Sequence, residues 1–209
     1  MADNSCDTEA LLRRAREGGS DALGELILRY SGRLRAMVDL RLDRRLSGRV
    51  DASDVLQETF LDAARSFVQY RERPDRSFYV WLRCIAERRL VDIHRHHLGV
   101  QARDPRREVS LSGWPSADAT SAAIAARILG SGPSPSEAAI GAERAARLAA
   151  ALDKMDRLDR EVLALRHFEQ LSNAEAAQVL GIGESAASKR HLRALDRLKE
   201  ALKDLREGE

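Results

Sequence analysis

The sequence contains few cysteines, few aromatic residues and no long apolar run. Its two cysteines, Cys6 and Cys84, stand apart and form neither a Cys-x-x-Cys pair nor the His/Cys spacing of a metal site. No apolar stretch reaches the roughly 20 residues that span a bilayer, and no apolar signal region precedes Leu11. We therefore expect a cytoplasmic chain with reduced thiols and no membrane insertion.

The composition favours helices. Of the 209 residues, 44% are hydrophobic, 33% are charged and only 4% are aromatic. Ala, Leu, Arg and Glu are abundant, a balance typical of soluble helical domains rather than β-sandwiches or disordered chains. We predict an all-α protein. The net charge of +2 does not by itself indicate a nucleic-acid partner, because the distribution of charge matters more than its sum.

Three regions of the chain differ in pattern. Residues 8–100 carry apolar stripes at helical spacing and predict a helical bundle. Residues 101–140 are rich in Ser, Ala, Gly and Pro, which predicts a flexible linker with one short helix across 119–129. Trp114 is an unusually large residue for such a segment. Residues 141–206 return to helical spacing and predict a second helical domain.

Capping residues mark the expected helix boundaries. We expect N-caps at Ser20, Ser77 and Asp159. Ser172 and Glu175 have the spacing of a capping box, and Gly181 suits the left-handed position that follows a helix. Together they predict a short helix that ends in a tight turn.

The stretch LSNAEAAQVLGIGESAASKRHLRAL, residues 171–195, predicts a helix-turn-helix. Alanines on the first helix allow a close crossing, and a glycine-containing turn then presents a polar second helix, whose first turns reach base edges in such motifs. Its hydroxyl and basic side chains are the candidate DNA contacts: Ser185, Ser188, Lys189, Arg190 and Arg193. A solvated or partner-binding helical hairpin is the alternative that the pattern leaves open.

Two segments of the first domain carry contrasting charge. The stretch from Arg83 to Arg107 is a basic helix end that continues into a basic loop, which suits either phosphate contacts or a solvated arginine-rich face. The segment DASDVLQETFLDAA places acidic residues away from much of its apolar stripe. DNA would repel this acidic face, so we expect a basic protein as its partner.

Taken in order, three stretches resemble the sigma factors of bacterial RNA polymerase, specifically the two-domain extracytoplasmic-function group. DASDVLQETFLDAARSF is similar to the segment that binds the clamp helices of the polymerase β′ subunit. FYVWLRCIAERRLVDIHR is similar to the helix that opens and reads the promoter −10 element, and residues 158–202 are similar to the domain that reads the −35 element. The resemblance implies a region 2 bundle, a region 4 helix-turn-helix domain, and an initiation factor without catalytic activity, cofactor or metal.

The resemblance also assigns roles to individual residues. Core polymerase contacts fall on Asp54, Gln57 and Glu58. Contacts to the −10 region fall on Arg88, Arg89 and Arg95, and Arg190 and Arg193 fall on arginines of the −35 recognition helix. The implied partners are core RNA polymerase, through its β′ clamp helices and β subunit, promoter DNA, and an anti-sigma factor that masks the polymerase-binding surfaces.

The sequence departs from the family at both DNA-reading helices. Residues 186–190 read Ala-Ala-Ser-Lys-Arg where many members have Thr-Val-Lys-Ser-Arg, which moves the lysine by one position, about 100° around the helix. Arg88 and Arg89 stand where many members have Arg-Asn. The promoter sequences of relatives therefore do not transfer to this chain.

Two other functional classes compete with this interpretation. A stand-alone helix-turn-helix regulator would bind DNA by itself, usually as a dimer, but the acidic segment and the long linker argue against it. An enzyme or metal protein would use Cys84, or Asp92 with the cluster His94, His96 and His97. A buried cysteine and a basic helix end explain these residues more simply.

Several remaining side chains are assigned by their spacing. Phe78, Trp81 and Leu82 are expected in the core, whereas Tyr79 is left open as a support for unstacked bases. His167 and His191 look isolated in the sequence and carry no predicted role.

Overall fold

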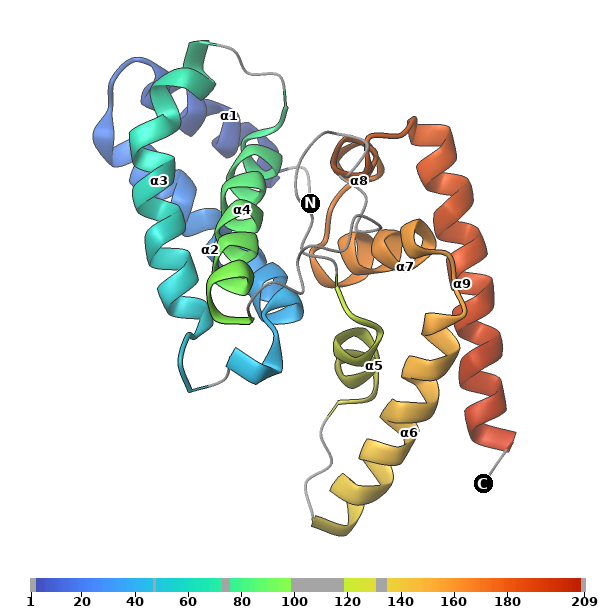
Figure 1. The fold of residues 1–209 in the computed structure, drawn as a ribbon. Coiled ribbons are helices and arrows are strands. Elements are labelled where there is room, and N and C mark those ends of the chain that lie inside the picture. Colours follow the sequence, from blue (N-terminus) through green and yellow to red (C-terminus); the bar gives the residue numbers. More distant parts are fainter. Residues whose placement is uncertain (1–2, 47, 73–75, 99–118, 131–134, 208–209) are drawn as a thin grey trace. The chain divides into compact units, whose positions relative to one another are not determined.

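The computed structural model describes residues 3–46, 48–72, 76–98, 119–130 and 135–207, and every regular element within these ranges is a helix (Figure 1). The prediction of an all-α fold is confirmed. The chain forms two compact units, Met1–Ala102 and Arg103–Glu209, which are described separately. None of the described helices combines the length and the apolar character that crossing a membrane requires.

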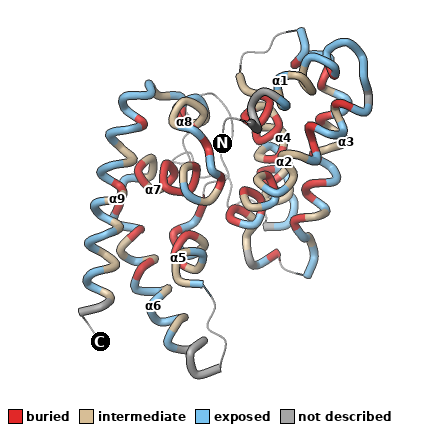
Figure 2. Tube along the Cα trace, turned by 180° about the vertical axis from the view of Figure 1, so that it is seen from behind, coloured by how far each residue is buried: buried red, intermediate tan, exposed pale blue. Residues whose placement is uncertain are grey.

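The N-terminal unit is a helical bundle. It contains α1 (Asp3–Arg16), α2 (Ser20–Arg41), the short 3₁₀ helix η1 (Arg44–Leu46), α3 (Ala52–Glu72) and α4 (Phe78–Leu98). Helices α2, α3 and α4 pack against one another, and α1 packs against α2. Their buried residues line the sides that face each other (Figure 2), because each apolar stripe recurs at helical spacing.

Aromatic side chains fill one part of this core. Tyr70 stacks on Trp81 with ring centroids 4.7 Å apart, and Phe78 contacts both rings. Phe78 and Leu82 are buried as predicted, and Trp81 is half-buried. Tyr79 is also buried, with the guanidinium of Arg33 3.9 Å from its ring centroid. Tyr79 is therefore a core residue and does not offer its face to unstacked bases.

The helix boundaries of this unit test the predicted caps. Ser77 caps α4, since its Oγ accepts a hydrogen bond from the Val80 N–H at 3.3 Å. The N-cap expected at Ser20 is wrong: α2 already includes Ser20, and Gly19 takes the cap position without a side-chain hydrogen bond. Gly18, with φ of 98°, makes the turn between α1 and α2.

The C-terminal unit consists of α5 (Ser121–Leu129), α6 (Pro135–Asp153), α7 (Arg157–Leu163), the π-helical turn η3 (Ala164–Phe168), α8 (Asn173–Leu180) and α9 (Glu184–Glu207). The long helix α9 packs against α6, α7 and α8. Leu148, Leu163, Ala187 and Ala194 are fully or almost fully buried, so alanines on α9 allow it to lie close to the unit's core.

The short helix predicted across 119–129 is present as α5 and packs on α6. Thr120 caps it, Ile124 is fully buried, and the Ser121 hydroxyl donates to Asp153 Oδ1 at 2.6 Å. This part of the predicted linker thus contributes to the core of the C-terminal unit, because its Ala- and Ile-rich face fits a neighbouring helix. Trp114 lies outside the described residues.

Candidate functional site

The turn between α8 and α9 has the geometry that the sequence predicts. Ser172 and Glu175 form a reciprocal capping box, with N–H···O distances of 2.9 and 3.1 Å. Gly181 ends α8 in the left-handed conformation, at φ 65° and ψ 31°, and the Ile182 N–H returns to the Ala177 carbonyl at 3.1 Å. Local sequence thus determines where α8 stops and α9 begins.

Packing and one amide side chain hold α9 against α8. Ala176, Ala177 and Leu180 of α8 are buried between the helices. Asn173, the first residue of α8, donates from Nδ2 to the Glu184 carbonyl at 3.0 Å. The Ser188 hydroxyl lies 3.4 Å from Asn173 Oδ1. The N-terminal turns of α9 are therefore oriented by α8, as in a helix-turn-helix.

Ser185, Ser188 and Lys189, which the sequence predicts as DNA contacts, lie on the exposed side of α9. Leu192 follows them one helical turn later and is 63% exposed. Ala187 and Ala194 mark the opposite, buried side. The start of α9 therefore presents two hydroxyl groups and one ammonium group to solvent, and the aliphatic side chain of Leu192 follows them.

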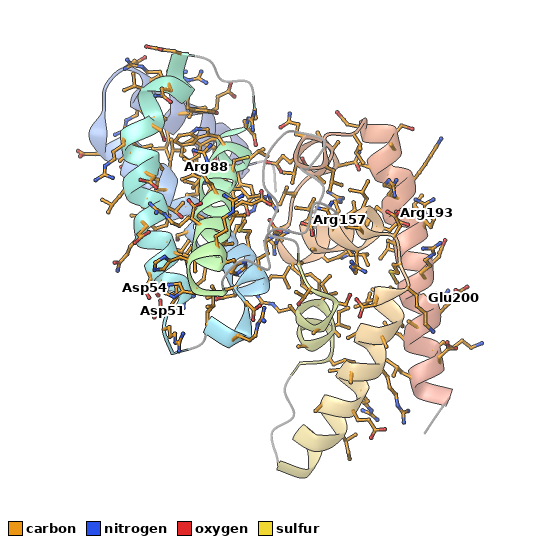
Figure 3. All side chains as sticks on the ribbon, in the orientation of Figure 1. Asp51, Asp54, Arg88, Arg157, Arg193 and Glu200 are labelled. Atoms are coloured by element: carbon orange, nitrogen blue, oxygen red, sulfur yellow. The ribbon has the colours of Figure 1, made fainter. Side chains whose placement is uncertain are left out.

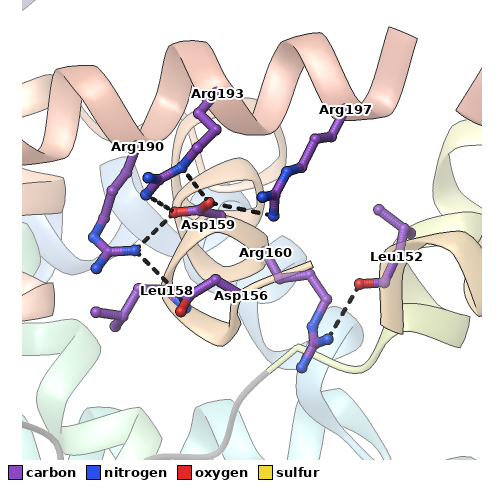
Figure 4. Close-up of polar contacts among 8 residues, drawn as sticks. All are labelled: Leu152, Asp156, Leu158, Asp159, Arg160, Arg190, Arg193 and Arg197. Carbon is purple, nitrogen blue, oxygen red and sulfur yellow. Dashed lines mark hydrogen bonds and ion pairs between the residues drawn. The ribbon is translucent and has the colours of Figure 1, made fainter. Parts of the chain in front are cut away.

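Arg190 and Arg193 lie on a different side of α9, where they contact a buried carboxylate of α7 (Figure 4). Arg193 donates twice to Asp159, at 2.7 and 2.9 Å, and Arg190 donates to Asp159 at 2.8 Å and to Asp156 at 2.9 Å. Arg197 lies 3.9 Å from the same carboxylate, whose side chain has no exposed area. These arginines thus link α9 to α7.

The N-cap expected at Asp159 is wrong. Asp156 occupies that position and accepts from the Leu158 N–H at 2.9 Å, so α7 begins at Arg157 and Asp159 points to α9 instead. Burial by itself would raise the pKa of Asp159, but hydrogen bonds from Arg193 and Arg190 outweigh it and lower the pKa below the usual value. Asp159 is thus a carboxylate held ionised by α9.

The start of α3 carries the acidic residues assigned to polymerase binding. Asp51 accepts from the backbone N–H groups of Ser53 and Asp54, and Asp54 accepts in return from the Asp51 N–H at 3.0 Å. Figure 3 shows the two carboxylates beside each other at this helix end. Asp54 therefore has a capping role of its own, although it is exposed, as are Gln57 and Glu58.

Arg89 of α4 bridges two carboxylates of α3. Its Nε lies 3.0 Å from Glu58 Oε2, and its Nη2 donates to Asp62 Oδ2 at 2.6 Å. A residue predicted to contact DNA and a residue predicted to contact polymerase are thus paired within the unit. Arg88 (Figure 3) and Arg95 are exposed on the same helix.

Other polar residues of α4 have structural roles. Arg83, which the sequence groups with the basic face, is buried and donates to Glu87 Oε2 at 2.9 Å, so it is not available to a phosphate. Burial raises the pKa of the Cys84 thiol, which disfavours a nucleophilic thiolate. His94 accepts from the Asp43 N–H at 3.4 Å. Within the described part of the chain, no three or more His, Cys, Asp or Glu side chains gather to hold a metal.

His167 and His191, which look isolated in the sequence, meet in the structure. Their Nε2 atoms are 2.9 Å apart, one from η3 and the other from α9. No local pattern predicts this contact, because 24 residues separate the two positions.

The two units match two models of one protein family. Residues 26–98 match sigma-70 region 2, and residues 145–198 match sigma-70 region 4. Together these matches occupy more than half of the chain. The first contains α3 and α4, and the second contains α7, α8 and most of α9.

Curated relatives agree with these matches. The chain is 28% identical to the RNA polymerase sigma factor NccH of Alcaligenes xylosoxydans over 95% of both chains. It is 28% identical to the sigma factor CnrH of Cupriavidus metallidurans over 90% of both chains. It is also 32% identical to the ECF RNA polymerase sigma-E factor of Haemophilus influenzae, over 52% of this chain and 51% of that protein.

Solved structures show the same fold. CnrH in complex with the cytosolic domain of CnrY matches with a TM-score of 0.54 and 25% identity, over 93% of this chain and 96% of that one. The sigma factor RpoE of Bartonella quintana, solved with the anti-sigma factor NepR, matches with a TM-score of 0.50 and 18% identity, over 88% and 97%. The chain belongs to the sigma-70 family, as an extracytoplasmic-function sigma factor that directs RNA polymerase to promoters.

Proposed function

We propose that the two units divide promoter recognition between them: α3 binds core polymerase, α4 acts at the −10 element, and α9 reads the −35 element. The exposed polar start of α9 carries this proposal. The capping box, the left-handed glycine and the Asn173 contact orient that helix, and its hydroxyl and ammonium groups suit base edges and phosphates.

Arg190 and Arg193 have a double role in this proposal. A guanidinium has five N–H donors, and Asp159 uses two of them on Arg193. The Arg193 side chain remains 51% exposed and that of Arg190 26% exposed. Asp159 thus orients both cations beside the exposed side of α9, where their remaining donors can meet the phosphates that flank the −35 bases.

The acidic start of α3 is the proposed polymerase contact. Gln57 and Glu58 are exposed within the first two turns of α3, and Asp54 adds a third polar group. The negative charge of this side suits basic groups on the β′ clamp helices. Region 4, in the other unit, is the proposed contact with the β subunit. Arg89 holds Glu58 in place from the neighbouring helix. Arg88, Arg89 and Arg95 are the proposed −10 contacts on α4.

A second protein is the remaining proposed partner. The CnrH structure contains the cytosolic domain of CnrY, and we infer that an anti-sigma factor covers the polymerase-binding surface of this chain as well. The proposed site of action is the cytoplasm, where polymerase and promoter DNA meet, and we assign no catalytic step to the chain. Tagged chain isolated from its own cells should yield two separate complexes, one with polymerase subunits and one without.

Polymerase binding provides the direct test. Purified chain is mixed with bacterial core RNA polymerase, pulled down, and assayed by run-off transcription on a library of promoter fragments. We expect stoichiometric binding and new start sites that share −35 and −10 sequences. Glu58→Arg should abolish binding because it reverses the charge of the contact. Glu72→Arg, the same change at the exposed far end of α3, serves as the matched control and should bind normally.

DNA binding by the chain in the absence of polymerase, together with failure to bind the core enzyme, would overturn the proposal. Equal loss of binding in the Glu58 and Glu72 variants would show that the effect comes from net charge and not from the start of α3.

A further inference from the structure

His167 and His191 form a pair that the proposed function does not use. Their Nε2 atoms are 2.9 Å apart, and the ring centroids are separated by 5.1 Å with an angle of 38° between the planes. The His167 side chain is exposed and that of His191 is half-buried, so solvent reaches the pair. We propose that His167 and His191 bind a divalent first-row transition-metal ion through one Nε2 atom each.

The distance between the two nitrogens is close to that of a two-histidine chelate. Zinc–nitrogen bonds are about 2.0–2.1 Å long, and two such bonds at a tetrahedral angle place their nitrogens about 3.3 Å apart. The pair therefore has to open by about 0.4 Å, a small rotation of two imidazole rings. Imidazole is a ligand that suits zinc, copper and nickel, and water molecules would complete the coordination.

The protons balance without a change in net protonation. In the hydrogen-bonded pair, one neutral ring carries its proton on Nε2 and donates a hydrogen bond through it to Nε2 of the other ring. When the metal binds, that proton moves to Nδ1 of the same ring, and both Nε2 lone pairs become ligands. Binding thus replaces an N–H···N hydrogen bond by two metal–nitrogen bonds and releases no proton at neutral pH.

Metal binding requires neutral imidazole rings, and the surroundings of both histidines favour the neutral form. Burial and the nearby Arg166 cation lower the pKa of His167. Burial, His167 and Arg166 lower the pKa of His191. The Arg166 charge also opposes a bound cation, but its guanidinium is directed to the Leu171 carbonyl.

Two packed elements hold the ligands in place before the metal arrives. His167 lies on η3, where Ala164 and Leu165 are buried, and His191 lies between the buried Ala187 and Ala194 on α9. His191 also follows Arg190 by one residue, about 100° around the helix. The metal would therefore attach α9 to η3 on a different side of α9 from the Asp159 contacts.

Cobalt(II) titration of the full chain tests the site without polymerase or DNA, so its outcome is independent of the proposed function. The reference chain carries His96→Gln and His97→Gln, so that His94, His167 and His191 are its remaining histidines. We expect one Co²⁺ per chain, visible absorption bands, and competition by Zn²⁺. His167→Gln and His191→Gln, each added to the reference chain, should weaken binding by about tenfold or more, since one imidazole ligand remains.

Histidine side-chain NMR during the same titration locates the metal. The Nε2 signals of His167 and His191 should shift together and before that of His94. Circular dichroism establishes that each variant is folded. Unchanged Co²⁺ affinity in both folded variants would overturn the proposal, and so would the absence of binding to the reference chain at about 1 mM Co²⁺, a concentration that corresponds to only about 4 kcal/mol.

Discussion

Both units of this sigma factor use arginine–carboxylate contacts to join neighbouring helices, but the two sets differ in burial. In the N-terminal unit, Arg89 contacts Glu58 and Asp62, whose side chains are 54% and 35% exposed. In the C-terminal unit, Arg193 contacts Asp159, which has no exposed side-chain area. Water competes for the first set of contacts and is excluded from the Asp159 carboxylate, so breaking the contacts should cost the second unit more stability than the first.

The difference in burial also separates charged residues that hold the fold together from charged residues that can bind another molecule. Solvent-exposed carboxylates such as Glu58 can change partners at little cost, which suits a surface that has to meet another protein. Asp159 cannot leave its arginines without remaining desolvated and unpaired. We therefore expect the α3–α4 contacts to tolerate change and the α7–α9 contacts to set the position of the recognition helix.

Among the substitutions considered, Asp159→Ala should lower the unfolding free energy the most. It removes the acceptor shared by Arg190 and Arg193, and we expect the unfolding free energy of the C-terminal unit to fall by about 2–3 kcal/mol. The loss stays within this range because both arginines are exposed enough to turn to water. Urea unfolding of the full chain followed by circular dichroism measures it. Asp156→Ala, which removes an exposed cap and one Arg190 contact, should cost only about 1 kcal/mol. Equal losses would remove the distinction between buried and exposed carboxylates.

Arg190→Ala tests whether an arginine that contacts the buried Asp159 also contacts DNA. We expect promoter binding by the holoenzyme to weaken by about 1–3 kcal/mol if Arg190 reads a base. Loss of a phosphate contact, the role proposed above for Arg190, would instead weaken binding about equally on all sequences and lower the salt dependence of binding. Arg197→Ala is the matched control, because Arg197 also approaches Asp159 but lies two helical turns beyond Arg190. If Arg190→Ala weakens promoter binding no more than Arg197→Ala does, Arg190 acts only through the fold.

Acid should weaken the contacts between α7 and α9 by protonating Asp159. The pKa of this carboxyl is lowered in the folded chain, so its stabilisation is complete above the unfolded value, about 3.9, and is lost as pH falls through the folded value. We expect the C-terminal unit to lose stability below about pH 4 more steeply than the Asp159→Asn variant does. Unfolding curves collected from pH 2 to 6 compare the two slopes, and identical slopes would contradict the role of Asp159.

Asp62→Ala should have the smallest effect. It removes one of two carboxylates from Arg89, which keeps Glu58, and exposed pairs contribute about 0–1 kcal/mol. The unfolding free energy of the N-terminal unit, measured as for Asp159→Ala, should change by less than about 1 kcal/mol. A loss as large as that of Asp159→Ala would show that burial does not separate the two sets.

Local features of the fold could be predicted because their causes lie within a few residues. The capping box of Ser172 and Glu175, the left-handed turn at Gly181 and the cap of α4 at Ser77 depend on side chains close to the backbone groups that they satisfy. The N-caps expected at Ser20 and Asp159 were wrong by one and three residues, because Gly19 and Asp156 take the cap positions.

The helices, the helix-turn-helix and the family could be predicted from the sequence, since periodicity, capping and motif order are properties of neighbouring residues. Tertiary structure decided which charges and rings meet. Asp159 with Arg193 and His167 with His191 are separated by 34 and 24 residues. Such contacts depend on how helices cross, which helical spacing leaves open. The carboxylate that each arginine of α9 meets, and the burial of Tyr79, were therefore settled by packing and not by pattern.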